Sequence, residues 1–182
     1  MYLSGKAQVP RVRYSLPYEA AMKTALTIGF FDGVHLGHRI ILEKLRTYPH
    51  ATILTFSNHP RSILNPPAPK LLLPFEEKIT LLQQYADNVI ALPFTLEYAK
   101  TPFDELLAQY DLSHIILGSG SAFGKNREGN EANVRAFAAK KEIHVEYIPK
   151  LYIDGKPVSS SRIRTAIADG NLNLANQLLG KI

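Results

Sequence analysis

The sequence predicts an α/β fold, a doubly wound parallel sheet of about five strands flanked by helices. Short apolar, β-branched runs alternate with longer segments whose apolar residues recur at helical spacing, which is the pattern of repeated βαβ units. Two of the runs, at 24–30 and 114–118, lead directly into glycine-rich turns. Doubly wound sheets bind ligands at such turns. We therefore expect strand 24–30 at the centre of the sheet and a ligand at its carboxyl edge.

The expected elements follow from apolar periodicity and from turn residues. Residues 1–23, interrupted by Pro10 and Pro17, are expected to form an extended lead-in segment. Thr101 is expected to cap a helix that has Pro102 in its first turn. In order, we expect strand 24–30, helix 36–47, strand 51–56, loop 57–74, helix 75–85, strand 89–92, a helix beginning at 101–104, strand 114–118, loop 118–130, a helix from about 131, strand 143–153, a hairpin turn at 154–155, a helix after Ser159 and a helix at 172–179.

The bulk composition narrows the class of protein. The 182 residues are enough for one domain with a substantial core. With no cysteine, the chain has no disulfide, thiolate metal site or cysteine nucleophile. A net charge of +5 suits anionic ligands such as nucleotides, but no dense Lys/Arg run indicates nucleic acid. No apolar run reaches membrane-helix length and no signal-peptide core begins the chain. We expect a cytoplasmic protein with no obligate protein partner.

The segment 29–38, G-F-F-D-G-V-H-L-G-H, is the most informative stretch of the chain. It joins a buried strand to the start of a helix, where free N–H groups and the helix dipole favour a phosphate. Gly29, Gly33 and Gly37 would let backbone approach a ligand closely. His35 and His38 could donate hydrogen bonds to phosphate oxygens. A helix-capping turn with two surface histidines would use the same residues.

Three further segments carry candidate functional residues, and each has a plainer explanation. The proline-rich loop 57–74 is either functional or a stiffened surface connection. The glycine-rich loop 118–130 is either a nucleotide site or a flexible link. The Ser159-Ser160-Ser161 helix start, with Arg164 in its first turns, could clamp a triphosphate or simply cap the helix. No His/Asp/Glu cluster indicates a dedicated metal site.

The segment 29–38 resembles the H-x-G-H nucleotidyltransferases, and among them the FMN adenylyltransferase module of bacterial bifunctional riboflavin kinase/FAD synthetases. The resemblance continues through T-F-S-N-H-P at 55–60, F-G-K at 123–125 and V-S-S-S-R-I-R at 158–164, and so spans about 25–180. It implies a Rossmann-like nucleotidyltransferase fold. It also implies transfer of AMP from ATP to FMN, giving FAD and pyrophosphate, with Mg²⁺ bound to ATP.

The resemblance also implies roles for individual residues. His35 and His38 would contact α- and β-phosphate oxygens as catalytic residues, and Arg164 would hold the β- and γ-phosphates. The implied ATP-binding residues are Gly29, Phe30, Phe31, Asp32, Gly33, Gly37, His38, Gly118, Ser159, Ser160, Ser161 and Arg164. The implied flavin-binding residues are Phe56, Asn58, His59, Pro60, Phe123 and Gly124.

The chain departs from the family pattern at three positions. Asn58 replaces a proline, and Gly120 and Ser121 replace a polar and an aromatic residue. Restoring the last two as Gly120→Asp and Ser121→Phe is expected to tighten nucleotide binding or speed FAD formation, unless Gly120 has a positive φ, where a side chain would cost about 1 kcal/mol or more. Since the chain stops near Gly180, a riboflavin kinase module is expected to be absent. Two alternatives are a nucleotidyltransferase with another phosphorylated acceptor and a non-catalytic flavin- or nucleotide-binding module.

Overall fold

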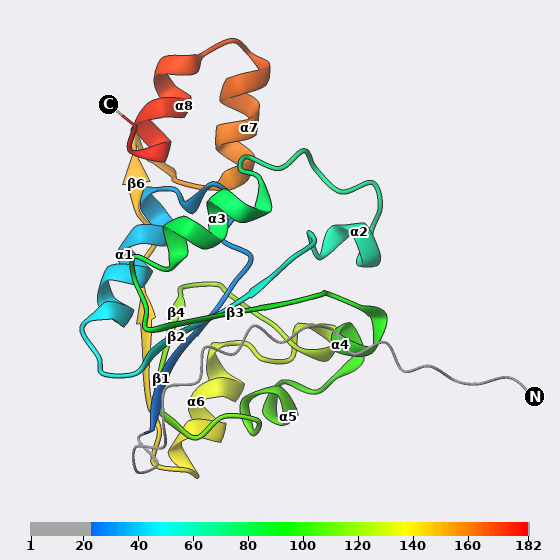
Figure 1. Cartoon of the computed structure of the whole chain (residues 1–182), viewed down its shortest axis with the longest axis vertical. Coiled ribbons are helices and arrows are strands. Elements are labelled where there is room, and N and C mark those ends of the chain that lie inside the picture. Colours follow the sequence, from blue (N-terminus) through cyan, green and yellow to red (C-terminus); the bar gives the residue numbers. More distant parts are fainter. Residues whose placement is uncertain (1–22, 182) are drawn as a thin grey trace, which may run out of the picture.

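The computed structural model describes residues 23–181, which form a five-stranded parallel sheet between two layers of helices (Figure 1). The sheet strands are β1 (Thr24–Ile28), β2 (Ala51–Phe56), β3 (Asn88–Leu92), β4 (Leu112–Gly118) and β5 (His144–Ile148). The helices are α1 (Leu36–Arg46), α2 (Arg61–Leu64), α3 (Phe75–Leu82), α4 (Leu96–Lys100), α5 (Phe103–Leu107), α6 (Glu131–Ala139), α7 (Ser160–Ala168) and α8 (Leu172–Leu179). The predicted fold class is confirmed. The expected lead-in at 1–22 lies outside the described residues.

The strand order β3-β2-β1-β4-β5 places β1 at the centre, as predicted. All four neighbouring pairs are parallel, with Ala25 of β1 facing Ala51 of β2 on one side and His114 of β4 on the other. The chain builds outward through β2 and β3, then crosses to β4 and β5. The carboxyl ends of β1 and β4 therefore border the switch point, where such sheets bind ligands.

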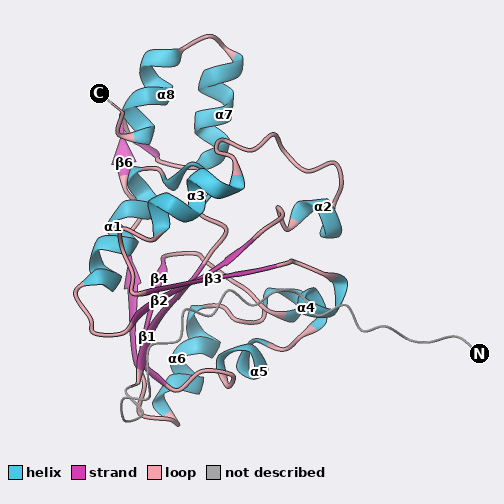
Figure 2. Ribbon diagram, viewed as in Figure 1, coloured by secondary structure: helices cyan, strands magenta, loops and turns pink. Residues whose placement is uncertain are grey.

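The strands are apolar on both faces because helices cover both faces of the sheet (Figure 2). In β1, Ala25 packs in a cluster with Leu42 of α1 and Leu82 of α3. The next residue, Leu26, packs in the opposite cluster with Leu107 of α5 and Val134 of α6. This alternation is the two-residue period of a strand, and it holds the central strand rigidly between two cores.

A third apolar cluster joins α7 and α8, which form a helical hairpin beyond one end of the sheet (Figure 1). A two-stranded hairpin, β6 (Tyr152–Ile153) and β7 (Lys156–Pro157), precedes it. Its turn residues Asp154 and Gly155 have φ of 52° and 68°, the positive values that a tight hairpin of this kind needs. The predicted turn is confirmed, and it delivers the chain to Ser159 at the start of α7.

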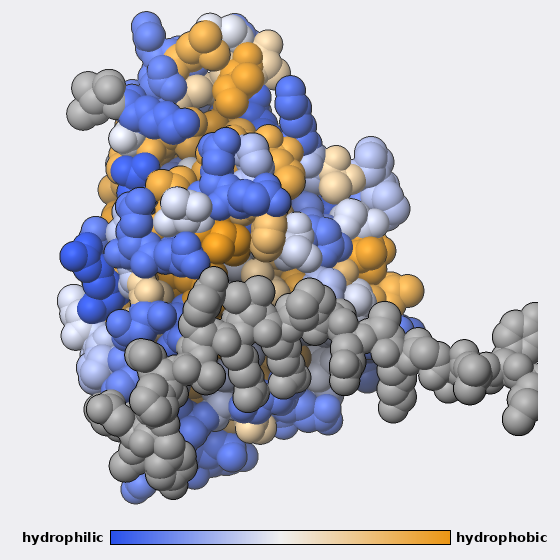
Figure 3. Space-filling model, viewed as in Figure 1, coloured by the Kyte–Doolittle hydropathy of each residue, from blue (hydrophilic) through white to orange (hydrophobic). Residues whose placement is uncertain are grey.

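The surface of the described residues mixes polar and apolar side chains (Figure 3). The largest exposed apolar side chains include Ile167 of α7 and Leu172 of α8, on the terminal helical hairpin. Within residues 23–181, the helices are too short or too polar for any of them to span a lipid bilayer.

Three local predictions are wrong. The expected loop 57–74 contains the four-residue helix α2, which is too short to show helical periodicity. The expected strand 143–153 is split into β5 and β6, because Pro149 follows β5 directly and lacks the N–H that would continue the ladder. Thr101 does not cap α5; its hydroxyl donates to the carbonyl oxygen of Glu97 at 2.9 Å, at the end of α4. Helix α4 was not expected, since five residues are too few to show helical periodicity.

Candidate active site at the carboxyl edge of the sheet

The chain turns sharply between β1 and α1 through a short 3₁₀ segment, η1 (Asp32–Val34). Phe31, Gly33 and Val34 have φ of 56°, 82° and 38°, so the turn has positive φ at three residues. A Cβ atom on Gly29 would lie 2.8 Å from the Phe31 ring. A side chain at position 29 would therefore displace the Phe31 ring, which folds back against the backbone there.

His35 and His38 form a stacked pair at the start of α1. The Nδ1 atom of His35 accepts the backbone N–H of His38 at 3.2 Å, which caps the helix. The two rings are nearly parallel, at 14°, with centroids 3.5 Å apart. The Phe31 ring meets His38 edge-on at 5.3 Å. The histidine orientations are thus fixed by the helix start and by aromatic packing.

Burial keeps both rings neutral at pH 7. It lowers the pKa of His35 from 6.5 to about 4. It also lowers the pKa of His38 well below 6.5, with further lowering from His35 and Lys78. The Nδ1 atom of His38 is buried and has no hydrogen-bond partner among residues 23–181. The pair therefore offers hydrogen bonds to a phosphate rather than a fixed positive charge.

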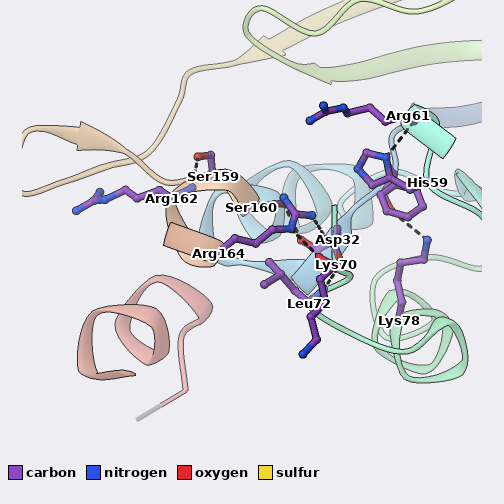
Figure 4. Close-up of polar contacts among 11 residues, drawn as sticks. Asp32, His59, Arg61, Lys70, Leu72, Lys78, Ser159, Ser160, Arg162 and Arg164 are labelled. Carbon is purple, nitrogen blue, oxygen red and sulfur yellow. Dashed lines mark hydrogen bonds and ion pairs between the residues drawn. The ribbon is translucent and has the colours of Figure 1, made fainter. Parts of the chain in front are cut away.

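The start of α7 makes two polar contacts to the β1–α1 turn and one to Lys70 in the loop after β2 (Figure 4). The Ser160 hydroxyl donates to the carbonyl oxygen of Asp32 at 2.9 Å. The Arg164 guanidinium pairs with the buried Asp32 carboxylate and donates from Nε to the carbonyl oxygen of Lys70 at 2.7 Å. The other Asp32 oxygen accepts the N–H of Leu72 at 2.9 Å. Asp32 is thus the junction between three segments distant in sequence.

These segments enclose a cavity of about 500 Å³. Every residue predicted to bind ATP lines it, with the exception of Gly33. Gly33 is buried beneath the turn, where a Cβ atom would meet Leu72 at 2.8 Å. Ser159 lines the cavity and also caps α7, accepting the N–H of Arg162 at 3.2 Å. The structure therefore brings the predicted nucleotide residues together.

The predicted flavin residues are dispersed. Only His59 lines the cavity. Phe56 is buried against the rings of Phe94 and Tyr98. The Asn58 amide pairs with the backbone of Phe94, accepting its N–H at 2.8 Å and donating to its carbonyl oxygen at 3.0 Å. These two side chains hold the loop after β2 against the segment after β3, outside the cavity lining.

The remaining three flavin candidates also lie outside the cavity lining. Pro60 precedes the short helix α2. Phe123 packs edge-on against the Phe103 ring at 6.4 Å, and a Cβ atom on Gly124 would lie 2.7 Å from Phe103. Phe123 and Gly124 thus pack within the loop between β4 and α6, against Phe103.

The loop after β4 lines the cavity through Gly118, Ser119, Gly120 and Ser121. Gly120 has φ of 83°, so a side chain at this position would strain the backbone. The Ser121 hydroxyl is buried with no hydrogen-bond partner in the described part of the chain. The loop thus presents one unpaired hydroxyl where the family pattern has an aromatic ring.

Lys78 is a buried residue beside the site that the sequence did not single out. The signal was present, because Lys78 falls three residues after Phe75 and four before Leu82, on the inward face of the helix. Its ammonium donates to the carbonyl oxygens of Phe30 and Phe56. A lysine on a core-facing stripe usually has a specific partner. Lys150 and Arg61 also line the cavity and were not predicted.

Comparison with known proteins gives relatives over most of the chain. Residues 18–162 match the FAD synthetase family. The chain is 35% identical over 170 residues to a bifunctional riboflavin kinase/FMN adenylyltransferase of Haemophilus influenzae, covering 86% of this chain and 55% of that protein. It is 33% identical over 175 residues to a FAD synthetase of Listeria monocytogenes, covering 90% and 71%. The chain thus spans about half the length of the bifunctional relatives it matches.

A solved structure confirms the fold. The crystal structure of a protein named as a macrolide-efflux protein, from Streptococcus pneumoniae, matches with a TM-score of 0.77 over 89% of this chain and 58% of that one. Its sequence identity is 23%, so this likeness speaks to the fold alone.

Proposed function

Because this chain belongs to the FAD synthetase family, we propose that it transfers the AMP group of ATP to FMN, giving FAD and pyrophosphate. The observation that best supports this proposal is that the 29–38 turn and the start of α7 line one cavity of about 500 Å³. Both are helix starts, with free N–H groups and the positive end of a dipole, which suit a polyphosphate. Small-molecule sites have volumes of roughly 300–1,000 Å³.

In the proposed reaction an oxygen of the FMN phosphate attacks the α-phosphorus of ATP in line. The new P–O bond forms as the bond from that phosphorus to the bridging oxygen breaks, and pyrophosphate leaves with the electron pair. A phosphate monoester is already anionic near neutral pH, so the step depends on positioning and charge stabilisation rather than on a strong base.

We assign His35 and His38 to the α- and β-phosphate oxygens, and Arg164 with Ser160 and Ser161 to the β- and γ-phosphates. Anionic phosphates beside the histidines would favour their charged forms and raise the pKa of both rings, so that either ring could protonate the leaving pyrophosphate. The Nη1 group of Arg164 makes no hydrogen bond to the described residues. Its two N–H donors would therefore be free for phosphate oxygens.

Mg²⁺ enters this proposal bound to the ATP phosphates. Residues 23–181 contain no group of three or more His, Asp or Glu side chains placed to hold a metal. Asp32, the carboxylate that lines the cavity, is engaged by Arg164 and by the Leu72 N–H. Phosphate and water oxygens would therefore supply the ligands, as is usual for this ion.

We further propose that residues 23–181 act as one nucleotidyltransferase unit in the cytoplasm, where ATP is available, and without a protein partner. A second candidate is transfer of AMP to a different phosphorylated acceptor. It is favoured by one observation: of the six predicted flavin residues, His59 alone lines the cavity.

Incubation with ATP and Mg²⁺ distinguishes these candidates. FMN, riboflavin and 4′-phosphopantetheine are offered separately, and products are resolved by chromatography. We expect FAD with FMN and no adenylylated product with riboflavin, which lacks the attacking phosphate. A product with phosphopantetheine but none with FMN would favour the second candidate. No product with any acceptor, in folded protein that binds ATP, would contradict nucleotidyl transfer.

A further inference from the structure

Lys78 is almost completely buried, with 3% of its surface exposed. Its Nζ atom donates to the carbonyl oxygen of Phe56 at 2.7 Å and to that of Phe30 at 3.1 Å. Phe30 lies just beyond the carboxyl end of β1, and Phe56 is the last residue of β2. An ammonium costs several kcal/mol to bury unless it is paired. Here one cation from α3 ties together the ends of two neighbouring strands.

The same ammonium lies over the face of the Phe30 ring, 3.9 Å from its centroid. This distance is well within the range of a cation–π contact. The Phe30 ring in turn meets the ring of His59 edge-on, at 4.7 Å between centroids and 67° between planes. A chain of contacts therefore runs from Lys78 through Phe30 to His59, and Phe30 and His59 line the cavity.

His59 is also held within its own loop. Its Nδ1 atom accepts the N–H of Arg61 at 3.1 Å, and its carbonyl oxygen accepts the Ser62 hydroxyl at 2.7 Å and the Ser62 N–H at 2.8 Å. These bonds are local to the loop after β2, whereas the ring contact with Phe30 joins the His59 side chain to the segment that follows β1. We assign the part of the cavity lined by Phe30 and His59 to the phosphorylated acceptor and call it the acceptor side. This moves Phe30, which the family resemblance placed among the ATP-binding residues, to the acceptor, because its ring packs against the His59 ring.

We propose that the charged ammonium of Lys78 is a positioning group for the acceptor side, because it ties the ends of β1 and β2 together and fixes the Phe30 ring against which His59 packs. The inference rests on the proposed function for its acceptor, a phosphorylated flavin. It adds a residue that acts through Phe30 and His59 and does not touch the substrate.

The protonation state of Lys78 gives this inference a distinct signature. Burial lowers the pKa of Lys78 from 10.5 to about 8, with Asp32 acting in the opposite direction. The titratable groups around it are Asp32 from η1, His38 from α1 and His59 from the loop after β2, while Arg164 of α7 is paired to Asp32. As pH rises through 8, the cation over the Phe30 ring is lost, and the hold on His59 weakens.

The first test measures His59 directly by NMR titration of its ring signals from pH 6.5 to 9.5, with His59→Ala for assignment. The wild type is expected to show a step near pH 8 from Lys78, and Lys78→Met, which keeps the length but not the charge, should lack it. Lys140→Met, a change on an exposed lysine of the opposite layer, should keep it. This readout does not depend on FAD synthesis.

The second test measures KM for each substrate at pH 7 and pH 9. Lys78→Met should raise KM for FMN about tenfold and change KM for ATP less than about twofold, because positioning of one side alone is lost. The wild-type KM for FMN should rise with pH, while that of Lys78→Met stays flat. Lys78→Arg, charged at both values of pH, should recover part of the FMN affinity without a pH step.

The two tests separate failure of this inference from failure of the proposed function. If the wild type makes no FAD, the proposed function is contradicted, and the NMR titration still tests the role of Lys78. A wild type that makes FAD, with KM for both substrates rising equally in Lys78→Met, overturns the inference. So does a His59 step that is absent from the wild type or persists in Lys78→Met. If Lys78→Met does not fold, the wild-type titration and Lys78→Arg decide.

Discussion

The two sides of the cavity are built by different means. The proposed nucleotide side, formed by His35, His38, Ser159–Ser161 and Arg164, consists of two helix starts joined through Asp32, whose carboxylate pairs with Arg164 and whose carbonyl oxygen accepts the Ser160 hydroxyl. In the proposed acceptor side, Phe30 contacts the buried Lys78, and His59 belongs to the loop after β2. The nucleotide side is held by local backbone motifs and one ion pair, whereas the acceptor side is held by long-range packing.

The largest expected effect is on the buried Asp32–Arg164 ion pair, which joins the two helix starts of the nucleotide side. Asp32→Ala should lower the free energy of unfolding by about 3 kcal/mol or more, because it leaves the Arg164 guanidinium without its buried partner and removes the acceptor of the Leu72 N–H. Chemical denaturation measures it. Asp154→Asn is the control for an exposed pair, since the Asp154–Arg162 pair is 3.8 Å apart with the aspartate 72% exposed and asparagine tolerates the positive φ at this turn position. Equal losses in the two variants would contradict this role of the buried ion pair.

The histidine pair should make the nucleotide side sensitive to acid. Between pH 6.5 and about 4 the unfolded chain binds a proton at His35 that the folded chain does not, so stability falls as pH falls through this window. At 1.36 kcal/mol per pH unit the loss from His35 approaches about 3 kcal/mol. His35→Asn keeps a helix-capping acceptor and should flatten the profile. An unchanged profile in that variant would place the acid sensitivity elsewhere.

The nucleotide side should carry the chemistry. His38→Ala is expected to lower turnover by at least about 100-fold, as for other groups that stabilise transition-state charge, while the melting temperature changes little. FAD formation at saturating ATP and FMN measures turnover. His144→Ala changes an exposed histidine at the start of β5 and should be neutral. Near-normal FAD formation by folded His38→Ala would remove His38 from the mechanism.

Arg164 should separate the two sides by substrate. Arg164→Ala is expected to raise KM for ATP about tenfold through loss of charged hydrogen bonds, with FMN affinity, measured by flavin fluorescence, nearly unchanged. Arg164→Lys should recover little, because lysine lacks the guanidinium fork. Denaturation of both variants is the control, since Asp32 also loses its partner. A larger effect on FMN than on ATP would move Arg164 to the acceptor side.

The smallest expected effect lies in the loop beside the acceptor side. Asn58→Ala should cost about 1 kcal/mol of stability, the value of its neutral hydrogen bonds to Phe94, and should raise KM for FMN a few-fold without affecting ATP. Asn133→Ala removes a comparable amide bond, to the carbonyl oxygen of Glu128, on an exposed helix, and should not affect FMN. An equal rise in KM for ATP in Asn58→Ala would contradict the assignment of this loop to the acceptor side alone.

The same difference explains what the sequence could predict. Short continuous segments encode strand β1, the start of α1 with His35 and His38, and the Ser159 cap of α7. The sequence therefore predicted both these features and their positions in the chain. Phe56, Asn58 and Phe123 were assigned from family resemblance, and their contacts to Phe94, Tyr98 and Phe103 depend on segments distant in sequence. Lys78 differs from these residues: its inward position on α3 could be read from the local sequence, but its partners Phe30 and Phe56 lie on distant segments.

Gly120 shows a limit of the family pattern. Gly120→Asp was expected to tighten nucleotide binding or speed FAD formation unless Gly120 had a positive φ, and the structure shows that it has one. With φ of 83° at Gly120, an aspartate adds strain of about 1 kcal/mol or more, which offsets a hydrogen bond of similar size. Backbone conformation at one position cannot be read from a motif that uses a different residue there.

The most direct test of nucleotidyl transfer follows the α-phosphate. ATP labelled at the α-phosphorus is incubated with FMN, Mg²⁺ and either the wild type or His38→Ala, and FAD and pyrophosphate are quantified. We predict that the wild type places the label in FAD, with one pyrophosphate released per FAD, and that His38→Ala nearly abolishes both. Label that stays in ATP or appears in ADP, with no FAD from a folded wild type that binds both ligands, would contradict the proposed transfer.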